Sequence, residues 1–237
     1  MNLIESTPEQ PEVVEKRTMA SQLEARVRQD IINGRLAPGS RLRLKELASQ
    51  YDAGVIPLRE ALSRLAASGF VYAEDQKGFK VGSISAEEIR DITRTRLLIE
   101  CEILVESIRF GDVEWESNLI AAHHRLLRLP IVEGPNRLIK PEWDKAHEAF
   151  HHALIAGCRS PWLLRLSHML RDQTSRYRML SVHYQNGTRD IPGEHLALLD
   201  AALKRDTAKA CDVLTQHYEA TMRSVVDNAA LKLNGSA

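Results

Sequence analysis

The sequence predicts a mainly α protein, in which an N-terminal winged helix-turn-helix precedes a C-terminal all-α helical bundle. Residues 41–81 contain two short amphipathic segments on either side of a glycine-containing turn, and a hairpin signal follows them. After Ser85, every periodic segment has apolar residues at the spacing of a helix, and none alternates as a strand does. A chain of 237 residues is long enough for these two modest domains.

The N-terminal domain is expected to span residues 18–82. The preceding residues 1–17 are polar, contain two prolines and lack periodicity, which predicts a disordered tail. Apolar residues then recur on one face from Thr18 to Asn33, which predicts a first helix that Gly34 ends.

A tight turn at residues 52–54 separates two further predicted helices. The first covers about Leu44 to Tyr51, and Gly54 is expected to supply the backbone freedom that the turn needs. Pro57 suits the first turn of the next helix, because its missing N–H would have no partner there. The buried stripe of this helix is expected to contain three leucines at helical spacing, Leu58, Leu62 and Leu65.

Two short strands are predicted next, at 71–73 and 79–81, around a turn that contains Gly78. Two helices followed by a hairpin form a shape that lays one helix in the major groove of DNA. The charge agrees, since residues 16–82 hold twelve Lys or Arg and seven Asp or Glu, whereas residues 83–237 hold twenty and twenty-one. The expected DNA-binding residues are Arg41, Lys45, Arg59, Arg64, Lys77 and Gly78.

The run PLREALSRLAASGFV, with KGFKV after it, resembles the DNA-binding domain of the GntR family of bacterial transcription regulators. The pattern of that family is roughly PVREALRRLEAEGLV followed by GRGTFV. The resemblance implies a homodimer that binds double-stranded operator DNA. Gly54, Val55 and Ile56 stand where the family usually has Ser-Arg-Thr. A base-reading arginine of the family is therefore absent at Val55, and the operator half-site is expected to differ.

The C-terminal domain is expected to span residues 83–230, followed by a tail over residues 231–237. Ser85 and Glu88 form a capping-box pattern, S-x-x-E, at the start of a long helix that ends near Phe110. The other helices of this bundle of about six are expected at Val113–Leu129, Pro141–Ala156, Pro161–Ser181, Pro192–Lys204 and Thr207–Ala229.

Four of the nine histidines have a geometric relation. His147 and His151 lie four residues apart, on one face of a helix, at a spacing that can share a metal ion. His195 and His217 are each eleven residues from Asp206, the centre of a turn between two helices. If those helices pack antiparallel, this pair comes face to face, and the first pair completes a pocket of four nitrogens. The alternative is four scattered histidines, and the rest are expected to be surface or incidental: His123, His124, His152, His168 and His183.

The histidine pattern resembles the FCD domain, the ligand-binding half of FadR-type GntR regulators. Many members carry Asp-x-x-Phe-His on one helix and two further histidines on the last two helices, and their divalent metal holds a carboxylate effector. The segment HEAFH occupies that motif, with His147 where the family commonly has Asp. Loss of a carboxylate ligand favours zinc or nickel over harder ions. Asp144, one turn earlier, is a candidate outer partner. The resemblance implies the ligands His147, His151, His195 and His217.

The same five residues also spell HExxH, the signature of zinc metalloproteases, in which the glutamate, here Glu148, activates a water molecule. So short a pattern arises by chance in a chain rich in His and Glu, and no HxxGxxH extension follows it. A zinc-dependent hydrolase is therefore kept as the alternative, and the protein is expected not to be an enzyme.

Arg96 sits where FCD members place an arginine on the first bundle helix, and arginine suits bidentate capture of a carboxylate. It could equally be a solvated or structurally paired residue. Arg176, Arg178 and Tyr184 are further candidates for effector binding, because they fall late on a bundle helix or just after it.

Within the FCD group, the segments GVIPLREAL, QKGFKV, GDVEWE and EWDKAHEAFH resemble the carbon-starvation-induced, CsiR-type repressors. This resemblance implies a repressor of genes for the breakdown of lysine-derived or related dicarboxylates, released by a small dicarboxylate such as glutarate. No apolar run approaches the ~20 residues of a membrane helix, and the N-terminus lacks the layout of a signal peptide. A cytoplasmic protein without a membrane partner is therefore expected.

Overall fold

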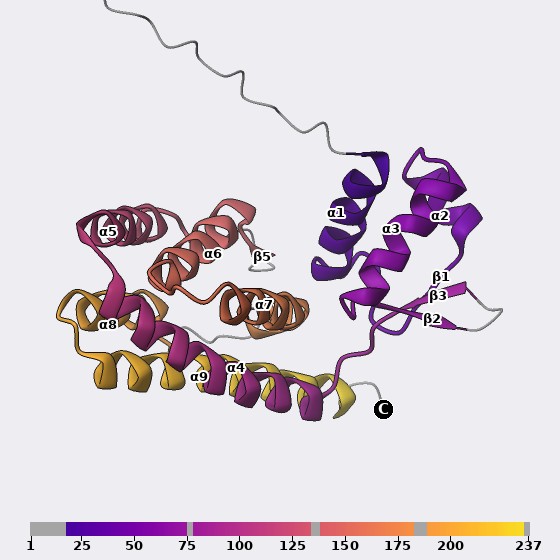
Figure 1. The fold of residues 1–237 in the computed structure, drawn as a ribbon. Helices are drawn as coiled ribbons and strands as arrows, with labels where there is room; N and C mark the ends of the chain where they lie inside the picture. The colour runs from indigo at the N-terminus through magenta and orange to yellow at the C-terminus, as the bar shows by residue number, and fades with distance from the viewer. Residues whose placement is uncertain (1–17, 75–77, 134–137, 183–188, 235–237) are drawn as a thin grey trace, which may run out of the picture.

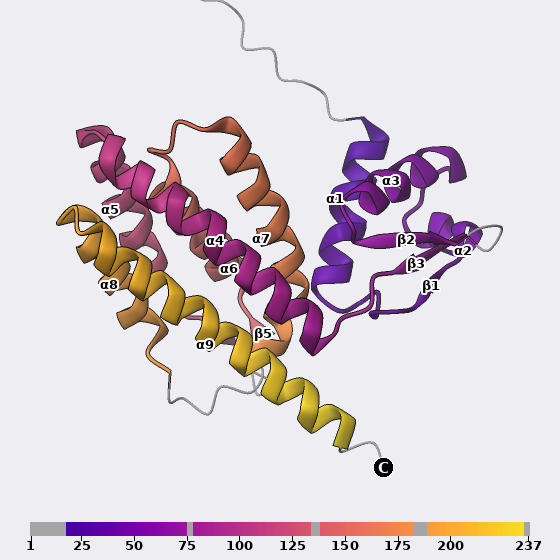
Figure 2. The same cartoon turned by 60° about the horizontal axis from the view of Figure 1, so that its bottom comes forward.

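The computed structural model describes residues 18–74, 78–133, 138–182 and 189–234. An N-terminal unit of three helices and a small sheet lies beside a larger bundle of six helices (Figure 1; Figure 2). The mainly α fold class agrees with the prediction. Among the helices of these residues, none is both long enough and apolar enough to cross a membrane.

The N-terminal unit contains the three predicted helices. Thr18 caps the first of them by accepting a hydrogen bond from the backbone N–H of Ser21 at 3.2 Å. The predicted leucine stripe is buried, since Leu58, Leu62 and Leu65 are each at most 1% exposed. The helices are α1 (Met19–Ile32), α2 (Leu44–Gln50) and α3 (Val55–Ala67).

The wing is an antiparallel sheet of three strands, one more than predicted. Arg41 and Leu42 pair with Lys80 and Phe79, so that the residues before α2 join the hairpin. A strand of two residues has no alternation that a sequence pattern could reveal. The strands are β1 (Arg41–Leu42), β2 (Val71–Glu74) and β3 (Gly78–Val81), in the order β1-β3-β2.

The turn between α2 and α3 differs from the expectation for Gly54. Asp52 takes the left-handed conformation, with φ of 49°, and aspartate tolerates this region better than most residues do. Gly54 has φ of −71° and is the N-cap of α3. A Cβ atom on Gly54 would lie 3.3 Å from Cδ of Pro57. Glycine therefore relieves a tight contact with Pro57 and does not supply the left-handed residue of the turn.

The C-terminal domain contains six helices near the predicted positions, and α4 and α9 run side by side along it (Figure 1; Figure 2). Two features differ from the prediction. The short strands β4 (Val132–Glu133) and β5 (Leu138–Ile139) pair where no strand was expected. The last helix continues to Asn234, into the segment expected as a tail. The helices are α4 (Ala86–Phe110), α5 (Val113–Leu127), α6 (Pro141–Ile155), α7 (Pro161–Val182), α8 (Ile191–Leu203) and α9 (Thr207–Asn234).

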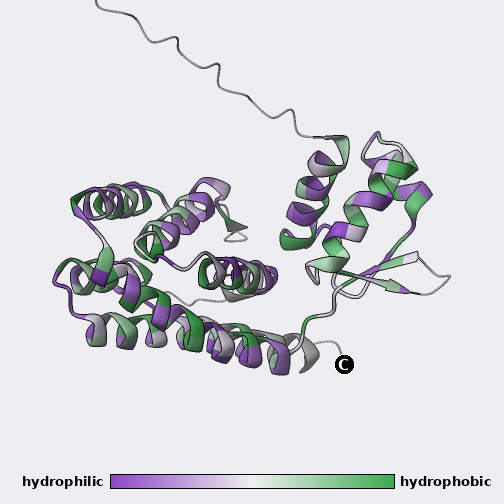
Figure 3. Ribbon diagram, in the orientation of Figure 1, coloured by the Kyte–Doolittle hydropathy of each residue, from purple (hydrophilic) through white to green (hydrophobic). Residues whose placement is uncertain are grey.

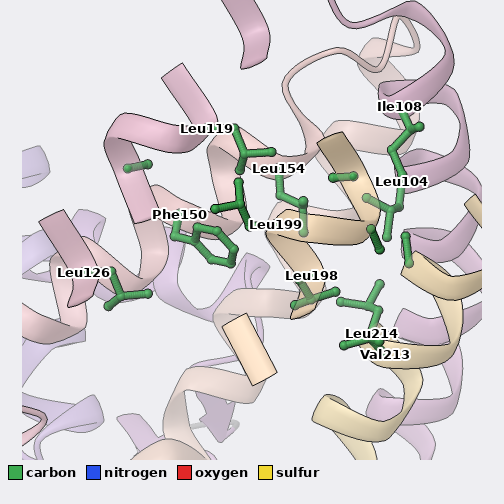
Figure 4. Close-up of a cluster of buried hydrophobic side chains, with 14 of the residues drawn as sticks. Leu104, Ile108, Leu119, Leu126, Phe150, Leu154, Leu198, Leu199, Val213 and Leu214 are labelled. Atoms are coloured by element: carbon green, nitrogen blue, oxygen red, sulfur yellow. The ribbon is translucent and has the colours of Figure 1, made fainter. Parts of the chain in front are cut away.

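The core of the bundle forms where α4, α5, α6, α8 and α9 meet (Figure 4). Leu104, Phe150, Leu198 and Leu214 come from four different helices, and each is at most 2% exposed. Apolar and polar residues are interspersed along these helices, as Figure 3 shows and as amphipathic helices require. Burial of each such side chain contributes roughly 1.5–3 kcal/mol. The core therefore holds α6 against the hairpin of α8 and α9.

The start of α4 is attached to α7. Ser85 caps α4, because its Oγ accepts a hydrogen bond from the N–H of Glu88 at 3.0 Å. The second half of the expected capping box is not formed, since the N–H of Ser85 donates to the Tyr177 hydroxyl at 3.2 Å. The Glu88 carboxylate instead accepts from Arg176 at 2.9 Å and from Tyr177. The hydrogen bond between Ser85 and Tyr177, which are 92 positions apart in the sequence, thus holds the N-terminal end of α4 against α7.

The helix α7 also contacts the N-terminal unit directly. Asp172 forms an ion pair with Arg28 of α1. Gln173 donates a hydrogen bond to the carbonyl oxygen of Ser68, at the C-terminal end of α3. One helix of the bundle therefore contacts both α1 and α3.

The helices α4 and α6 approach closely at Ser107. Its buried hydroxyl donates to the carbonyl oxygen of Leu154 at 2.8 Å and accepts from the N–H of Gly157 at 2.9 Å. A Cβ atom on Gly157 would lie 2.5 Å from the carbonyl oxygen of Ser107. This contact fixes the end of the helix that carries HEAFH.

The substitution Gly157→Ala is expected to destabilise the protein by roughly 1–3 kcal/mol, because the added methyl group must push α4 and α6 apart. Urea unfolding followed by far-UV circular dichroism measures the change in the free energy of unfolding. The exposed neighbour Ala156 offers a control, since Ala156→Ser should change this quantity by less than about 0.5 kcal/mol. Equal stabilities of Gly157→Ala and the wild type would contradict the packing described here.

Candidate functional site

Three helices bring four histidines together inside the bundle. His147 and His151 lie on α6, His195 on α8 and His217 on α9, and one ring nitrogen of each lies within 4.8 Å of the others. The α8–α9 turn places the rings of His195 and His217 with their centroids 4.9 Å apart. The four residues that the sequence pattern singled out thus share one location.

The positions of the nitrogens suit a single metal ion. Nε2 of His147 and Nε2 of His151 are 3.2 Å apart, and two ligands of a tetrahedral zinc ion, with bonds of about 2.1 Å, lie roughly 3.4 Å apart. Nε2 of His195 is buried and has no hydrogen-bond partner among the described residues, which is costly for a polar atom unless it binds something. The widest separation, 4.8 Å, exceeds the roughly 4.2 Å that one ion allows, so binding would draw the rings together slightly.

Glu194 and Arg189 hold the ring of His217 in place. Nδ1 of His217 lies 2.6 Å from Oε2 of Glu194, and Arg189 donates to the two oxygens of Glu194 at 2.7 and 2.6 Å. A carboxylate on Nδ1 fixes the ring and turns Nε2 toward a metal. The sequence pattern suggested Asp144 for such an outer role and missed Glu194, which immediately precedes His195.

Burial favours the neutral form of three of the four imidazoles, those of His151, His195 and His217. It lowers the pKa of His195 to about 2, and with the neighbouring His147 it lowers the pKa of His151 well below its ordinary value. Burial also lowers the pKa of His217, although Glu194 opposes this effect. Burial raises the pKa of Glu194, but the hydrogen bonds from His217 and Arg189 outweigh it and lower this pKa to about 2. A divalent metal binds neutral imidazoles, and an ionised carboxylate beside them is compatible with that binding.

A pocket lies beside three of the histidines, with about 590 Å³ of empty space when the part open to solvent is included. Arg96 lies in its wall, only 7% exposed, and donates to the two oxygens of Glu100 at 2.9 and 3.3 Å. It also donates to Oγ1 of Thr174 at 3.2 Å and stacks over the ring of Tyr218. Arg96 is therefore structurally paired and also present at the pocket. The pocket is lined by Ile89, Thr93, Arg96, His147, Glu148, His151, Arg171, Thr174, Ser175, His217, Tyr218, Thr221 and Met222.

The other predicted effector residues have different positions. Arg176 binds Glu88 at the start of α4 and is not among the residues that line the pocket. The side chain of Arg178 and the whole of Tyr184 lie outside the described residues. Arg171 lines the pocket but was missed, because nothing in the sequence distinguishes it from the other arginines of α7.

One histidine expected to be surface or incidental is instead buried. His123 on α5 is 7% exposed, and its ring centroid lies 5.6 Å from that of Phe150. The prediction of a surface position for His123 was therefore wrong, because α5 turns this residue toward the core. His183 lies outside the described residues.

The N-terminal unit presents most of the predicted DNA-binding residues to solvent. Arg59 on α3 and Lys45 on α2 are exposed. The side chain of Arg41, on β1, is 65% exposed and lies 3.9 Å from Glu74. Gly78 begins β3 with φ of 92°. The described residues do not include Lys77.

Two features of α3 differ from the DNA-binding surface that was predicted for it. Arg64 donates to Oγ of Ser21 on α1 at 3.0 Å and lies 2.5 Å from the carboxylate of Glu60 on its own helix. Its charge is therefore partly neutralised within the domain. Ile56 is 84% exposed and Val55 is 38% exposed, so the first turn of α3 presents apolar side chains to solvent.

Comparison with known proteins assigns both halves of the chain. Residues 19–81 match the family described as bacterial regulatory proteins, gntR family, and residues 91–220 match the FCD domain. The chain is 40% identical to the HTH-type transcriptional regulator BphR of Paraburkholderia xenovorans, over 84% of this chain and 82% of that protein. It is 38% identical to the HTH-type transcriptional repressor GlaR of Escherichia coli, over 81% of this chain and 88% of that protein.

Solved structures share the fold. McbR/YncC of Escherichia coli matches with a TM-score of 0.71 at 19% identity, over 90% of this chain and 99% of that one. A putative GntR regulator from Rhodococcus sp. RHA1 matches with a TM-score of 0.67 at 19% identity, over 88% and 97%. Because these relatives are transcription regulators, the HEAFH segment does not mark a hydrolase, and the protein is not an enzyme. The chain belongs to the GntR family, as a DNA-binding transcription regulator whose C-terminal half is an FCD domain.

Proposed function

We propose that the protein represses an operon for carboxylate breakdown and is released by a small carboxylate bound at a metal-containing pocket. The observation that carries this proposal is the convergence of four histidines, three of them on the wall of the 590 Å³ pocket. A relative of 38% identity is described as a transcriptional repressor. The resemblance to CsiR-type repressors supports a lysine-derived dicarboxylate, such as glutarate, as the effector.

In this proposal His147, His151, His195 and His217 hold a divalent ion, and imidazole ligands favour zinc or nickel. The bound ion supplies a positive centre for carboxylate oxygens. The chain itself prepares the site, because Glu194 orients His217 and the buried Arg96 keeps a positive charge at the pocket wall.

The N-terminal domain acts on DNA in this proposal as half of a homodimer. Two copies place their α3 helices in successive major grooves of a pseudo-palindromic operator. Arg59, exposed on α3, suits a guanine, which arginine contacts through two hydrogen bonds. Phosphate contacts are assigned to the cations and the glycine around that helix, namely Arg41, Lys45, Arg64, Lys77 and Gly78.

The helix α7 is suited to transmit the state of the pocket to the DNA-binding domain. Thr174 and Ser175 line the pocket, whereas Asp172 and Gln173 contact α1 and the end of α3. A shift of α7 on ligand binding would therefore alter contacts with both helices. The long helix α4, attached to α7 through Glu88, would move with it.

The substitution Arg59→Ala is expected to weaken operator binding at least about tenfold, because a bidentate base contact is worth roughly 1–3 kcal/mol. A gel shift with the DNA upstream of the protein's own gene measures this change. Arg125→Ala removes an exposed arginine of α5 and serves as the control, which should bind as the wild type does. Unchanged binding by Arg59→Ala would remove this residue from the reading face.

The substitution His151→Ala is expected to reduce the zinc or nickel retained after dialysis and to suppress release from the operator by glutarate. Operator affinity without glutarate should stay within about threefold of the wild type, because the histidine is remote from α3. Metal content and gel shifts with and without glutarate measure these effects. His152→Ala, at the exposed adjacent position, is the matched control. Normal metal content and normal release in His151→Ala would separate the histidines from sensing.

The double substitution Asp172→Asn with Gln173→Ala is expected to reduce the glutarate-induced change in operator affinity at least about threefold. Affinity for glutarate itself should be retained, since neither side chain lines the pocket. Calorimetry measures ligand affinity and gel shifts measure the change. Arg165→Gln, at an exposed position of the same helix, is the control. A wild-type response in the double variant would assign transmission to another route.

A further inference from the structure

Arg171 has a buried guanidinium group without a hydrogen-bonded partner in the described part of the chain. It lies on α7 and lines the pocket beside the histidines. Its Nε, Nη1 and Nη2 atoms are all closed to solvent, and none of them makes a hydrogen bond to a described residue. A guanidinium has five N–H donors and keeps its charge in proteins, so this state is costly.

Two other arginines near the site show what Arg171 lacks. Arg96 donates to the two oxygens of Glu100, and Arg189 donates to the two oxygens of Glu194. Both pairs use the two-pronged geometry by which a guanidinium matches a carboxylate. Arg171 presents the same group to the pocket without such a carboxylate.

One carboxylate that Arg171 influences already has other partners. Arg171 lies close enough to Glu100 to help Arg96 lower its pKa, against the opposing effect of burial. Both oxygens of Glu100 nevertheless accept hydrogen bonds from Arg96, and one of them also accepts from the Tyr218 hydroxyl. Glu148 also lines the pocket, but it makes no hydrogen bond to the guanidinium of Arg171. An anionic group of a bound ligand would supply the partner that these two carboxylates do not.

We propose that Arg171 binds a second anionic group of the effector, so that the effector is a dianion. This inference rests on the proposed function, in which the first carboxylate binds at the metal. Arg171 lines the same pocket as His147, His151 and His217, so one small ligand could reach both the histidines and the guanidinium. Thr174 and Ser175, on the same helix, also line the pocket. Arg171 is accordingly the residue that distinguishes a dicarboxylate from a monocarboxylate.

Isothermal titration calorimetry on the zinc-loaded full chain tests the inference, with glutarate and pentanoate as five-carbon probes that differ in one carboxylate. Wild-type protein is expected to bind glutarate at least about tenfold more tightly than pentanoate. Arg171→Gln should lose about 10- to 100-fold in affinity for glutarate, as the loss of charge-assisted hydrogen bonds implies, and keep its affinity for pentanoate within about threefold. Arg171→Lys, which keeps the charge without the planar fork, should retain part of the preference.

The thermal midpoint of the ligand-free protein gives a second readout. Arg171→Gln should leave Tm unchanged or raise it, because it removes a buried charge without a bonded partner. Arg96→Gln should lower Tm, because it leaves the buried Glu100 without its ion pair. Arg165→Gln changes an exposed arginine of the same helix and should alter neither Tm nor ligand affinity.

Different failures have different meanings. If the wild type binds both probes and Arg171→Gln loses affinity for both equally, or for neither, the inference is overturned and the proposed function stands. If the wild type binds zinc and operator but neither probe, the carboxylate effector and the inference are overturned together. A fall in Tm for Arg171→Gln as large as that for Arg96→Gln would show that Arg171 has a structural role instead.

Discussion

The sensing half of the molecule depends on the packing of α6 against the hairpin of α8 and α9. Phe150, which immediately precedes His151, is fully buried in the core, and its ring centroid lies 5.2 Å from that of His195. The core that fixes this ring therefore also fixes the histidines around it. The same burial that stabilises the bundle removes water from the imidazoles and keeps them neutral. Burial of apolar side chains thus both stabilises the bundle and favours the neutral imidazoles that can bind a metal.

Three ion pairs between arginine and glutamate surround this core. Arg96 with Glu100 lies inside the bundle, Arg176 with Glu88 lies at the junction of the domains, and Arg189 with Glu194 lies beside His217 of the histidine cluster. Each pair connects or braces a different part of the bundle. Buried pairs of this kind contribute little net stability compared with an apolar core, but they fix geometry because breaking one leaves an uncompensated charge. The helix α7 belongs to this network and also contacts the DNA-binding domain.

Much of the fold could be predicted from the sequence, because helices longer than three turns leave a periodic pattern that local chemistry does not obscure. The face-to-face position of His195 and His217 also followed from their equal distance to a turn. The two-residue strands β1, β4 and β5 could not be predicted, since pairing partners define them. Glu194, Arg171 and the direction of Arg64 depend on which helices become neighbours, and spacing along one helix does not contain that information.

The apolar side chain of Ile56 at the start of α3 has a consequence for what this regulator can distinguish. The isoleucine side chain neither donates nor accepts hydrogen bonds, and this one is 84% exposed on the helix that is proposed to enter the major groove. In the proposed docking, a base pair opposite this side chain would be distinguished by its shape and by whether it carries a methyl group, as thymine does, because the isoleucine side chain forms no hydrogen bond with a base edge.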